Sequence, residues 1–354
     1  MKKLILLASL VLPLVSAQEY KIAVVGLVHS HVWGHLGRMV KSDAVKLAGV
    51  AEKNPELVAE AKKLGVADDL IFDDYAKMLD TVKPNIVWAF VENNRHLEIA
   101  KACASRKINI MFEKPLASTY KEAAEIRDLA KKSGIHVLTN YQMAWWASNY
   151  TAKAIADSGD LGNVYRIRGV VGHGGPGSEG ARNKYFFEWL TDPVKNGAGA
   201  LMDFGCYNAL WSLWYFGRPE TVYATAQHIR PERFPKVEDN ATLVLNYPKF
   251  SGVFEGSWDL PRSFQDLEVF GSKASEYMTN GKVEVRKGRD TTAATVAPLA
   301  PENSEPIAHM INAIKTGKAL EGMVALDINV QVIEIIDAAK ESIKTGRAVK
   351  LAVR

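Results

Sequence analysis

Residues 20–140 alternate short apolar runs with longer amphipathic stretches, and no other feature limits the fold so strongly. The amphipathic stretches have helical spacing and fall at residues 55–64, 75–82 and 97–106. The apolar runs are rich in β-branched residues and fall at residues 21–26, 45–51, 86–90, 108–112 and 136–139. Strands that alternate with helices imply a parallel sheet covered on both faces, with ligands beyond the C-terminal strand ends. We therefore predict an α/β fold that begins with a Rossmann-like, doubly wound parallel sheet.

After residue 141 the pattern changes to a helix at residues 149–158 and then a series of strands. These strands are expected at residues 164–171, 221–228, 241–247, 252–258 and 266–271. Few helices separate the last four, which predicts an open, mostly antiparallel sheet. A helical region at residues 306–345, broken by Gly317 and Gly322, is expected to pack back on the chain. With 354 residues favouring two domains, we expect a Rossmann domain at residues 18–140 and an α+β domain at residues 141–354.

The first residues have the pattern of a secretory signal peptide. Lys2 and Lys3 precede an apolar run at residues 4–15, and small residues follow it up to Ala17. This run is shorter than the roughly 20 residues that a membrane-spanning helix needs. We expect residues 1–17 to be removed, which predicts a periplasmic or secreted protein with no membrane association afterwards. An uncleaved membrane anchor is the alternative.

Charge and cysteine content exclude several classes of protein. The formal net charge is +4, and it falls to +2 when Lys2 and Lys3 are removed. So small a charge gives no electrostatic reason to bind nucleic acid or an anionic membrane. The two cysteines, Cys103 and Cys206, are too few for a disulfide scaffold, and we expect both to be buried and free.

The turn after the first predicted strand keeps part of a dinucleotide-binding fingerprint. That fingerprint places glycine at the first, third and sixth positions, whereas this chain has Gly26, Val28 and His31 there. Glu52 ends the second predicted strand, where a carboxylate can accept the hydroxyls of an adenosine ribose. A 2′-phosphate would meet a like charge at Glu52, so we expect NAD, with NADP possible because Lys53 is adjacent. A solvated strand end is the alternative for Glu52.

Three histidines around the same turn raise the question of a metal site. His31 and His35 can share one helix face, whereas His29 lies in the turn before the helix. Histidines at such spacing can bind zinc, but no carboxylate or cysteine nearby in the sequence completes a site. We therefore expect no metal, and both packing and ligand contact through the turn stay open for these residues.

Three motifs resemble those of the glucose-fructose oxidoreductase, inositol dehydrogenase and MocA (Gfo/Idh/MocA) family. Residues 112–117, Phe-Glu-Lys-Pro-Leu-Ala, resemble its Glu-Lys-Pro signature. Residues 92–96, Glu-Asn-Asn-Arg-His, are similar to its Pro-Asn-x-x-His segment, with Glu92 in place of Pro. Residues 196–207 resemble its Gly-Gly-Gly-x-Leu-x-Asp-x-Gly-x-His/Tyr segment. The likeness covers nearly the whole chain after residue 17, in order and in spacing.

This resemblance implies an NAD(P)-dependent oxidoreductase that acts on a CH–OH group of a sugar or polyol. It implies catalytic roles for Lys114, Asp203 and Tyr207, the last standing where many members have His. A hydride leaves a carbinol carbon only as the hydroxyl proton leaves, so a group that binds oxygen and passes a proton is required. Asp203 and Tyr207 share a face if Asp203 opens a helix through Trp214. A core aromatic is the alternative for Tyr207.

Further residues are expected to contact the cofactor or the substrate. The cofactor contacts are expected from Gly26, Val28, His29, His31, Glu52, Asn93, His96, Glu113 and Lys114. Aromatic faces stack on sugar rings, so we expect a substrate cleft bordered by Trp145, His173, Tyr185 and Trp189. For any one of these, a place in the core or in a subunit interface is the alternative. The family's open sheet commonly forms subunit interfaces, which implies a homo-oligomer, a dimer or a tetramer.

Export and a redox cofactor together constrain the reaction. A secreted enzyme has no free pool of NAD, so we hypothesise that the cofactor is tightly bound and recycled within the catalytic cycle. One alternative is an NAD-dependent glycoside hydrolase that oxidises its sugar transiently. Another is a redox-inactive carbohydrate-binding relative, which the missing glycines of the turn motivate.

Overall fold

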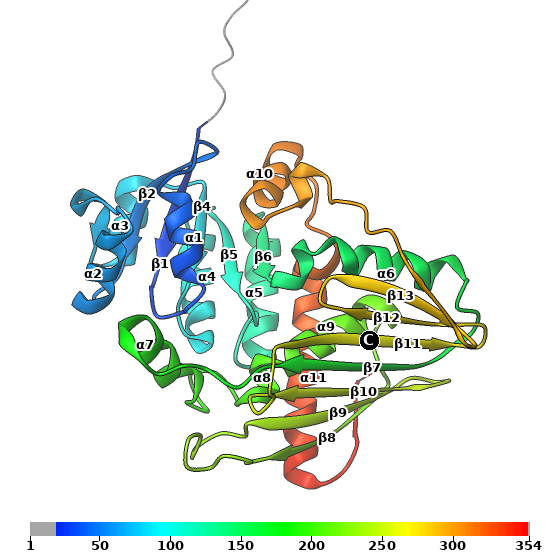
Figure 1. The fold of residues 1–354 in the computed structure, drawn as a ribbon. Coiled ribbons are helices and arrows are strands. Elements are labelled where there is room, and N and C mark those ends of the chain that lie inside the picture. The colour runs from blue at the N-terminus through cyan, green and yellow to red at the C-terminus, as the bar shows by residue number, and fades with distance from the viewer. Residues whose placement is uncertain (1–18, 353–354) are drawn as a thin grey trace, which may run out of the picture.

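The computed structural model describes residues 19–352, which form two β-sheets lying next to each other (Figure 1). Six strands make the first sheet and nine make the second. The predicted signal peptide at residues 1–17 lies outside the described residues. No helix within residues 19–352 combines the length and the apolar character that crossing a membrane requires.

The first sheet is parallel throughout and has the strand order β3-β2-β1-β4-β5-β6. Its strands are β1 (Tyr20–Val25), β2 (Val45–Ala51), β3 (Ile71–Phe72), β4 (Ile86–Ala89), β5 (Asn109–Glu113) and β6 (Val137–Asn140). Its helices are α1 (Val32–Met39), α2 (Pro55–Lys63), α3 (Tyr75–Val82), α4 (His96–Ala104) and α5 (Tyr120–Ser133). The predicted doubly wound sheet is therefore confirmed. The strand order reverses between β1 and β4, which is where such sheets bind ligands.

Local sequence explains why this sheet forms. β4 is buried along its whole length, as a central parallel strand with both faces covered must be. Helix α2 begins after Asn54, whose side chain accepts two backbone N–H groups, and α5 begins with a capping box made by Thr119 and Glu122. Helix α5 ends at Gly134, which has a left-handed backbone conformation.

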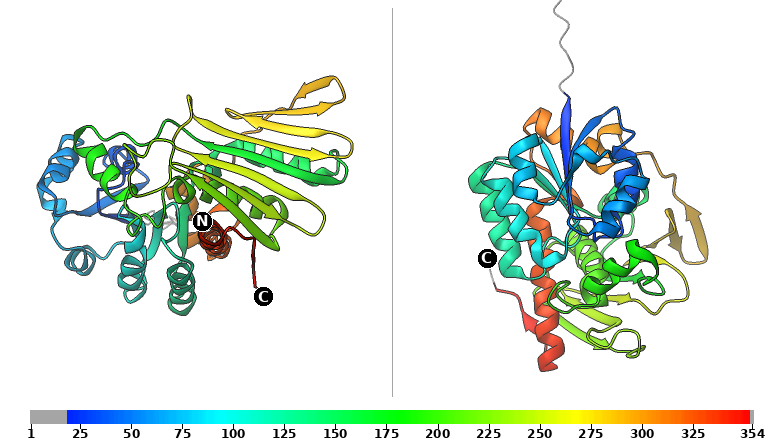
Figure 2. Two further views of the ribbon diagram at one scale, coloured as in Figure 1. Left: turned by 90° about the horizontal axis from the view of Figure 1, so that it is seen from below. Right: turned by 90° about the vertical axis from the view of Figure 1, so that its left-hand side faces the viewer.

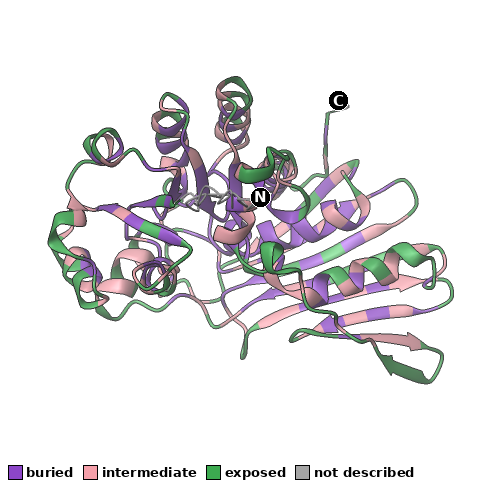
Figure 3. Cartoon of the chain, turned by 90° about the horizontal axis from the view of Figure 1, so that it is seen from above, coloured by how far each residue is buried: buried purple, intermediate pink, exposed green. Residues whose placement is uncertain are grey.

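The second sheet has the order β14-β13-β12-β11-β7-β10-β9-β8-β15. Strands β7 and β10 pair in parallel and the other neighbours pair antiparallel, which confirms the mostly antiparallel prediction. Its strands are β7 (Val164–Gly172), β8 (Thr221–Gln227), β9 (Asn240–Asn246), β10 (Ser251–Ser257), β11 (Phe264–Gly271), β12 (Ser275–Thr279), β13 (Lys282–Lys287), β14 (Asp290–Ala293) and β15 (Val349–Lys350). The outermost strand, β14, is exposed along its whole length (Figure 3).

Helices cover one face of the second sheet and join it to the first half of the chain (Figure 2). The helices of the second half are α6 (Ala147–Ser158), α7 (Gly180–Leu190), α8 (Ala200–Asp203), α9 (Gly205–Phe216), α10 (Pro306–Thr316) and α11 (Leu326–Thr345). Helix α9 packs on β7 and β10, and α11 packs on both α9 and α5. The break of the C-terminal helical region between Gly317 and Gly322 is confirmed. Cys103 and Cys206 are buried and free, as predicted.

Candidate active site

Lys114 joins the two halves of the molecule through a buried ion pair. It follows β5 directly, donates to the backbone oxygen of Asp203 at 3.0 Å and pairs with the Asp203 carboxylate. Burial alone would lower the pKa of Lys114, but the Asp203 carboxylate raises it above the usual value. For the carboxyl group of Asp203, burial alone would raise the pKa. The Lys114 ammonium outweighs burial and lowers the pKa of Asp203 below its usual value. The pairing therefore favours the ammonium form of Lys114 and holds it in one position.

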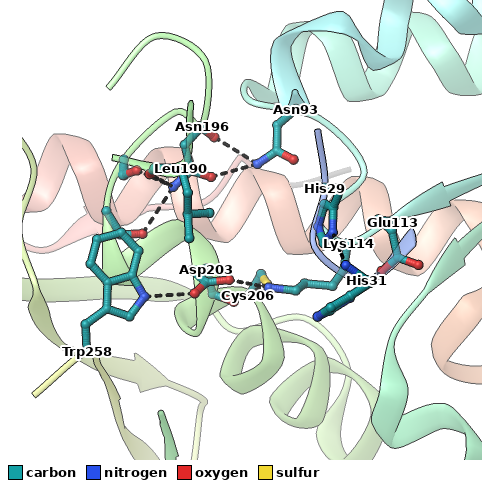
Figure 4. A network of polar contacts seen from close by, with 12 residues as sticks. His29, His31, Asn93, Glu113, Lys114, Leu190, Asn196, Asp203, Cys206 and Trp258 are labelled. Atoms are coloured by element: carbon teal, nitrogen blue, oxygen red, sulfur yellow. Dashed lines mark hydrogen bonds and ion pairs between the residues drawn. The ribbon is translucent and has the colours of Figure 1, made fainter. Parts of the chain in front are cut away.

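The glycine-rich segment before α8 fixes Asp203. The Glu238 carboxylate accepts the N–H groups of Gly199 at 2.7 Å and of Leu201 at 3.0 Å, and a Cβ on Gly199 would clash with the Glu238 backbone oxygen. The indole N–H of Trp258 donates to Asp203 Oδ2 at 2.8 Å (Figure 4). Both carboxylate oxygens of Asp203 therefore have partners.

The predicted helix from Asp203 through Trp214 is wrong in one respect. Asp203 ends the short helix α8, and α9 begins at Gly205 after a break at Phe204. Tyr207 lies in the first turn of α9, and its ring centroid is 5.1 Å from Lys114 Nζ. Asp203 and Tyr207 thus meet the same lysine from two consecutive helices. Burial raises the pKa of Tyr207, so its hydroxyl stays protonated.

These three residues line a cavity of about 320 Å³ at the C-terminal end of β5. His31 and His173 line it as well. The Gly175 N–H donates to His173 Nδ1 at 3.0 Å, and burial lowers the pKa of His173, which favours its neutral form. The cavity therefore combines a fixed ammonium with several hydrogen-bonding groups, as recognition of a hydroxylated molecule requires.

A second cavity, of about 260 Å³, lies beyond the ends of β1 and β2. Gly26 and Glu52 line it. Gly26 has φ +79°, and a Cβ there would clash with Val91. The Glu52 carboxylate accepts the backbone N–H groups of Leu27 and Lys53, each at 2.8 Å. Glu52 therefore holds the turn in place and also lines the cavity. A carboxylate at this position suits the adenosine half of a dinucleotide.

Helix α7 covers the turn between the two cavities. The buried ring of His29 lies against Phe186 and Trp189 of α7, with ring centroids 5.0 and 5.6 Å away. The indole N–H of Trp189 donates to the backbone oxygen of Val28 at 3.1 Å. Helix α7 is therefore packed directly on the turn that follows β1.

Glu113, the last residue of β5, is buried and accepts hydrogen bonds from two sides. His31 Nδ1 lies 2.9 Å from Oε2, and Asn140 Nδ2 donates to Oε1 at 2.7 Å. Burial would raise the pKa of Glu113, but the hydrogen bond and charge of His31 lower it. The sequence pattern shows no acid near the histidines, because β5 brings this one from 82 residues away.

The donor atoms of His29, His31 and Glu113 lie within 4.8 Å of one another. His31 and Glu113 bind each other, and His29 Nδ1 accepts the backbone N–H of His31 at 3.2 Å. We assign this group no metal, and the absence of a metal stays a prediction.

Two of the residues expected at the cofactor, Asn93 and His96, have contacts within the protein. Asn93 Nδ2 donates to the backbone oxygen of Asn196 at 3.1 Å and to its side-chain oxygen at 2.8 Å, which ties the first half of the chain to the glycine-rich segment (Figure 4). His96 Nδ1 donates to the backbone oxygen of Leu116 at 3.1 Å, and the ring stacks on Phe112. Neither residue lines the cavities described above.

Of the four residues expected to border the substrate cleft, His173 lines this cavity, whereas Trp145, Tyr185 and Trp189 do not. Trp145 turns its indole N–H to Asn140 at 2.8 Å and lines a separate cavity of about 590 Å³. Trp189 is buried because it binds the turn at Val28, and the Tyr185 ring packs against Lys184. The sequence did not indicate Trp258, Glu238 and Asn140, because they belong to no motif. The fold places them next to Asp203, Gly199 and Glu113, respectively.

Comparisons with known proteins agree with this architecture. Residues 20–141 match the family model described as "Oxidoreductase family, NAD-binding Rossmann fold", and residues 150–276 match the GFO/IDH/MocA C-terminal domain. D-xylose 1-dehydrogenase (NADP(+)) 2 of Haloferax volcanii is 25% identical over 82% of this chain and 89% of its own length. Levoglucosan dehydrogenase of Pseudarthrobacter phenanthrenivorans is 27% identical over 52% of this chain and 46% of its own length. Aldose-aldose oxidoreductase from Caulobacter crescentus shares the fold, with a TM-score of 0.81 at 21% identity over 94% of this chain and all of that one.

Proposed function

We propose, because the chain belongs to the GFO/IDH/MocA oxidoreductase family, that it oxidises a CH–OH group of a sugar or related polyol with a nicotinamide cofactor. The observation that carries this proposal is the buried Lys114–Asp203 pair with Tyr207, in a cavity at the C-terminal end of a parallel strand. Relatives named as xylose, levoglucosan and inositol dehydrogenases support a carbohydrate as the substrate class.

A nicotinamide dinucleotide, when bound, supplies the acceptor for the substrate hydride. The residues of the chain bind and polarise the hydroxyl group. The Lys114 ammonium, held by Asp203, stabilises the negative charge that develops on the hydroxyl oxygen. The protonated Tyr207 hydroxyl lines the same cavity and is available to hold a second hydroxyl of the sugar. Because Asp203 keeps Lys114 in place before substrate arrives, little reorganisation is needed during the reaction.

The cofactor that we propose is NAD, retained between turnovers. Glu52 lines the adenosine-type cavity, where its charge disfavours a 2′-phosphate. Retention is supported by α7, whose Arg182 binds Glu60 of α2 at 2.8 Å and lies 4.8 Å from the centre of the Trp33 ring. A dinucleotide beneath α7 would leave only when these contacts break, so one substrate would be oxidised and another reduced on the same bound cofactor.

We also propose a homo-oligomer and an exported protein. Tyr223, Val244 and Val253 are neighbours across β8, β9 and β10 on the face of the sheet opposite to the packed helices. Tyr223 and Val253 are 36% and 37% exposed, which supports a subunit contact there. The proposal of export is supported by the sequence of residues 1–17 alone.

The test is to purify the mature protein, denature it and record the absorbance of any released dinucleotide at the nicotinamide and adenine bands. Aldoses, polyols and aryl glycosides are then screened for products. We expect released NAD and an oxidised sugar, and Lys114→Met, which keeps the length of the side chain but not its charge, should lose turnover by about 100-fold or more. A protein that neither carries nor binds dinucleotide would refute the proposal.

A further inference from the structure

The catalytic cavity adjoins two further cavities, and the segment after β6 borders all three. Gln142, which is exposed at the start of this segment, lines the catalytic cavity and also the cavity of about 590 Å³ at Trp145. Residues 263–265 line the catalytic cavity and a third cavity of about 440 Å³. Trp146 lines the second and the third. Space for a ligand therefore extends from the catalytic cavity past Gln142 to Trp146.

The cavity of about 590 Å³, which we name the outer groove, lies between α1 and the start of α10. Its lining includes Arg38, Gln142, Trp145, Trp146 and Glu305. Arg38 donates to His35 Nδ1 at 2.7 Å and forms no ion pair within residues 19–352. No hydrogen bond within the same range holds the Gln142 side-chain amide or the Trp146 indole N–H. The outer groove therefore presents aromatic surface together with polar groups that can bind a ligand.

These residue types suit a sugar ring better than an apolar or an anionic ligand. A sugar ring offers C–H groups on its faces, which pack on aromatic rings, and hydroxyl groups at its edge. The Arg38 guanidinium donates hydrogen bonds and the Gln142 amide both donates and accepts them, so together they can bind such hydroxyl groups. A wholly apolar ligand would leave these groups without partners. Arg38 and Glu305 carry opposite charges, so the outer groove as a whole does not favour an anion.

The outer groove belongs to the substrate side of the site. It shares Gln142 with the catalytic cavity, where Lys114 and Tyr207 lie. In the described part of the chain it shares no lining residue with the adenosine-type cavity at Gly26 and Glu52. The catalytic cavity, at about 320 Å³, is near the lower end of the roughly 300–1,000 Å³ that small-molecule sites span. A molecule larger than a single sugar would therefore extend from it into the outer groove.

We propose that the outer groove is a subsite for a second sugar unit and that the substrate is a di- or oligosaccharide. One terminal unit is oxidised beside Lys114, and the unit linked to it lies past Gln142 with one face on the Trp146 indole. Arg38 binds hydroxyl groups of the same unit. The inference rests on the proposed function for the reaction itself and deepens it by naming the size of the substrate.

The first experiment measures the reduction of NAD, added in excess, by sugars of increasing length. Three series are used: glucose with maltose and maltotriose, glucose with cellobiose and cellotriose, and xylose with xylobiose and xylotriose. In at least one series we expect the second-order rate constant to rise by about 10-fold or more from monosaccharide to disaccharide, because a sugar ring packed on an indole gains binding energy. Monosaccharides that are oxidised as efficiently as every disaccharide would overturn the inference and leave the proposed function intact.

Variants of the outer groove test the residues assigned to it. Trp146→Ala should lower the ratio of disaccharide to monosaccharide rate constants by about 10-fold, and Trp146→Phe, which keeps an aromatic face, should retain most of this ratio. Arg38→Ala, at an exposed position where the fold tolerates change, should lower the ratio by about 3-fold. The control is Tyr165→Ala, which removes a 52% exposed aromatic ring outside the three cavities and should leave the ratio unchanged. Equal ratios in Trp146→Ala and the unchanged protein would overturn the inference.

The second experiment measures binding and does not depend on turnover. Maltose, cellobiose and xylobiose are titrated by calorimetry into the unchanged protein and Trp146→Ala, and the dinucleotide content of both is read by absorbance. We expect a disaccharide to bind the unchanged protein at least about 10-fold more tightly, with equal dinucleotide content in the two proteins. Loss of dinucleotide without a change in disaccharide affinity would assign the outer groove to the cofactor and overturn the inference. Failure to oxidise any sugar would instead refute the proposed function, and the titration would still decide whether the outer groove binds sugars.

Discussion

The ion pair between Lys114 and Asp203 should make a large contribution to stability, because both side chains are almost completely buried. Their exposed fractions are 6% and 7%. Removing one partner of a buried pair leaves an uncompensated charge and costs about 3–5 kcal/mol. For roughly 330 folded residues the entropy of unfolding is about 0.7 kcal/mol per kelvin, so Asp203→Ala should lower Tm by about 4–7 °C. Thermal unfolding at pH 7, followed by circular dichroism, measures this shift.

A surface pair provides the control for this prediction. Lys101 and Glu125 lie 2.7 Å apart between α4 and α5 and are 54% and 41% exposed. Exposed pairs contribute about 0–1 kcal/mol, so Glu125→Ala should change Tm by less than about 2 °C. The double variant Lys114→Met/Asp203→Leu should recover much of the lost stability, since no unpaired charge remains. If Asp203→Ala shifts Tm no more than Glu125→Ala does, the pair is not buried as described here.

Three further predictions concern pH, backbone and cofactor. Burial lowers the pKa of His96 to about 4, so between pH 6.5 and 4 the unfolded state binds a proton that the folded state does not bind. As the pH falls through this range, the free energy of unfolding measured with urea should decrease by about 3 kcal/mol. His96→Gln should remove this part of the pH dependence. Gly199→Ala forces a Cβ against the Glu238 backbone and should lower kcat at least ~10-fold by displacing Asp203, so unchanged kinetics would contradict the role of this segment. Glu52→Ala should weaken NAD more than NADP in titration calorimetry, and equal weakening would show that Glu52 does not read the ribose.

The sequence predicts the first sheet well because its strands are continuous apolar runs, and it fails where that signal is absent. Strand β3 has two residues, too few for any period to be visible. Strand β13 (Lys282–Lys287) and strand β14 are largely polar, and β14 is exposed throughout, so no apolar run marks them. These strands form because β12 offers a free edge for pairing, which is a tertiary effect that a local pattern does not contain.

The site residues could be predicted from the sequence only where they belong to a motif. Lys114 belongs to one motif, and Asp203 and Tyr207 belong to another, and the fold brings the two motifs together. The contacts of the tryptophans could not be predicted, because aromatic content says nothing about the direction of a side chain, and a buried indole N–H turns toward a nearby acceptor. Trp145 and Trp189 each follow this rule, binding Asn140 and Val28 rather than facing the catalytic cavity.

The contact between His31 and Glu113 links the turn after β1 to the end of β5. A glycine at residue 31 would leave space next to the end of β5, and the Glu113 carboxylate would lack the donor that lies at 2.9 Å from it. A buried carboxylate that loses one of its two close hydrogen-bond donors is destabilised, so residue 31 and residue 113 depend on each other for stability. His31→Gly should therefore destabilise the fold, whereas His31→Gly combined with Glu113→Gln should be less destabilised than the sum of the single variants. Additive effects in this double-mutant cycle would show that the two residues are independent.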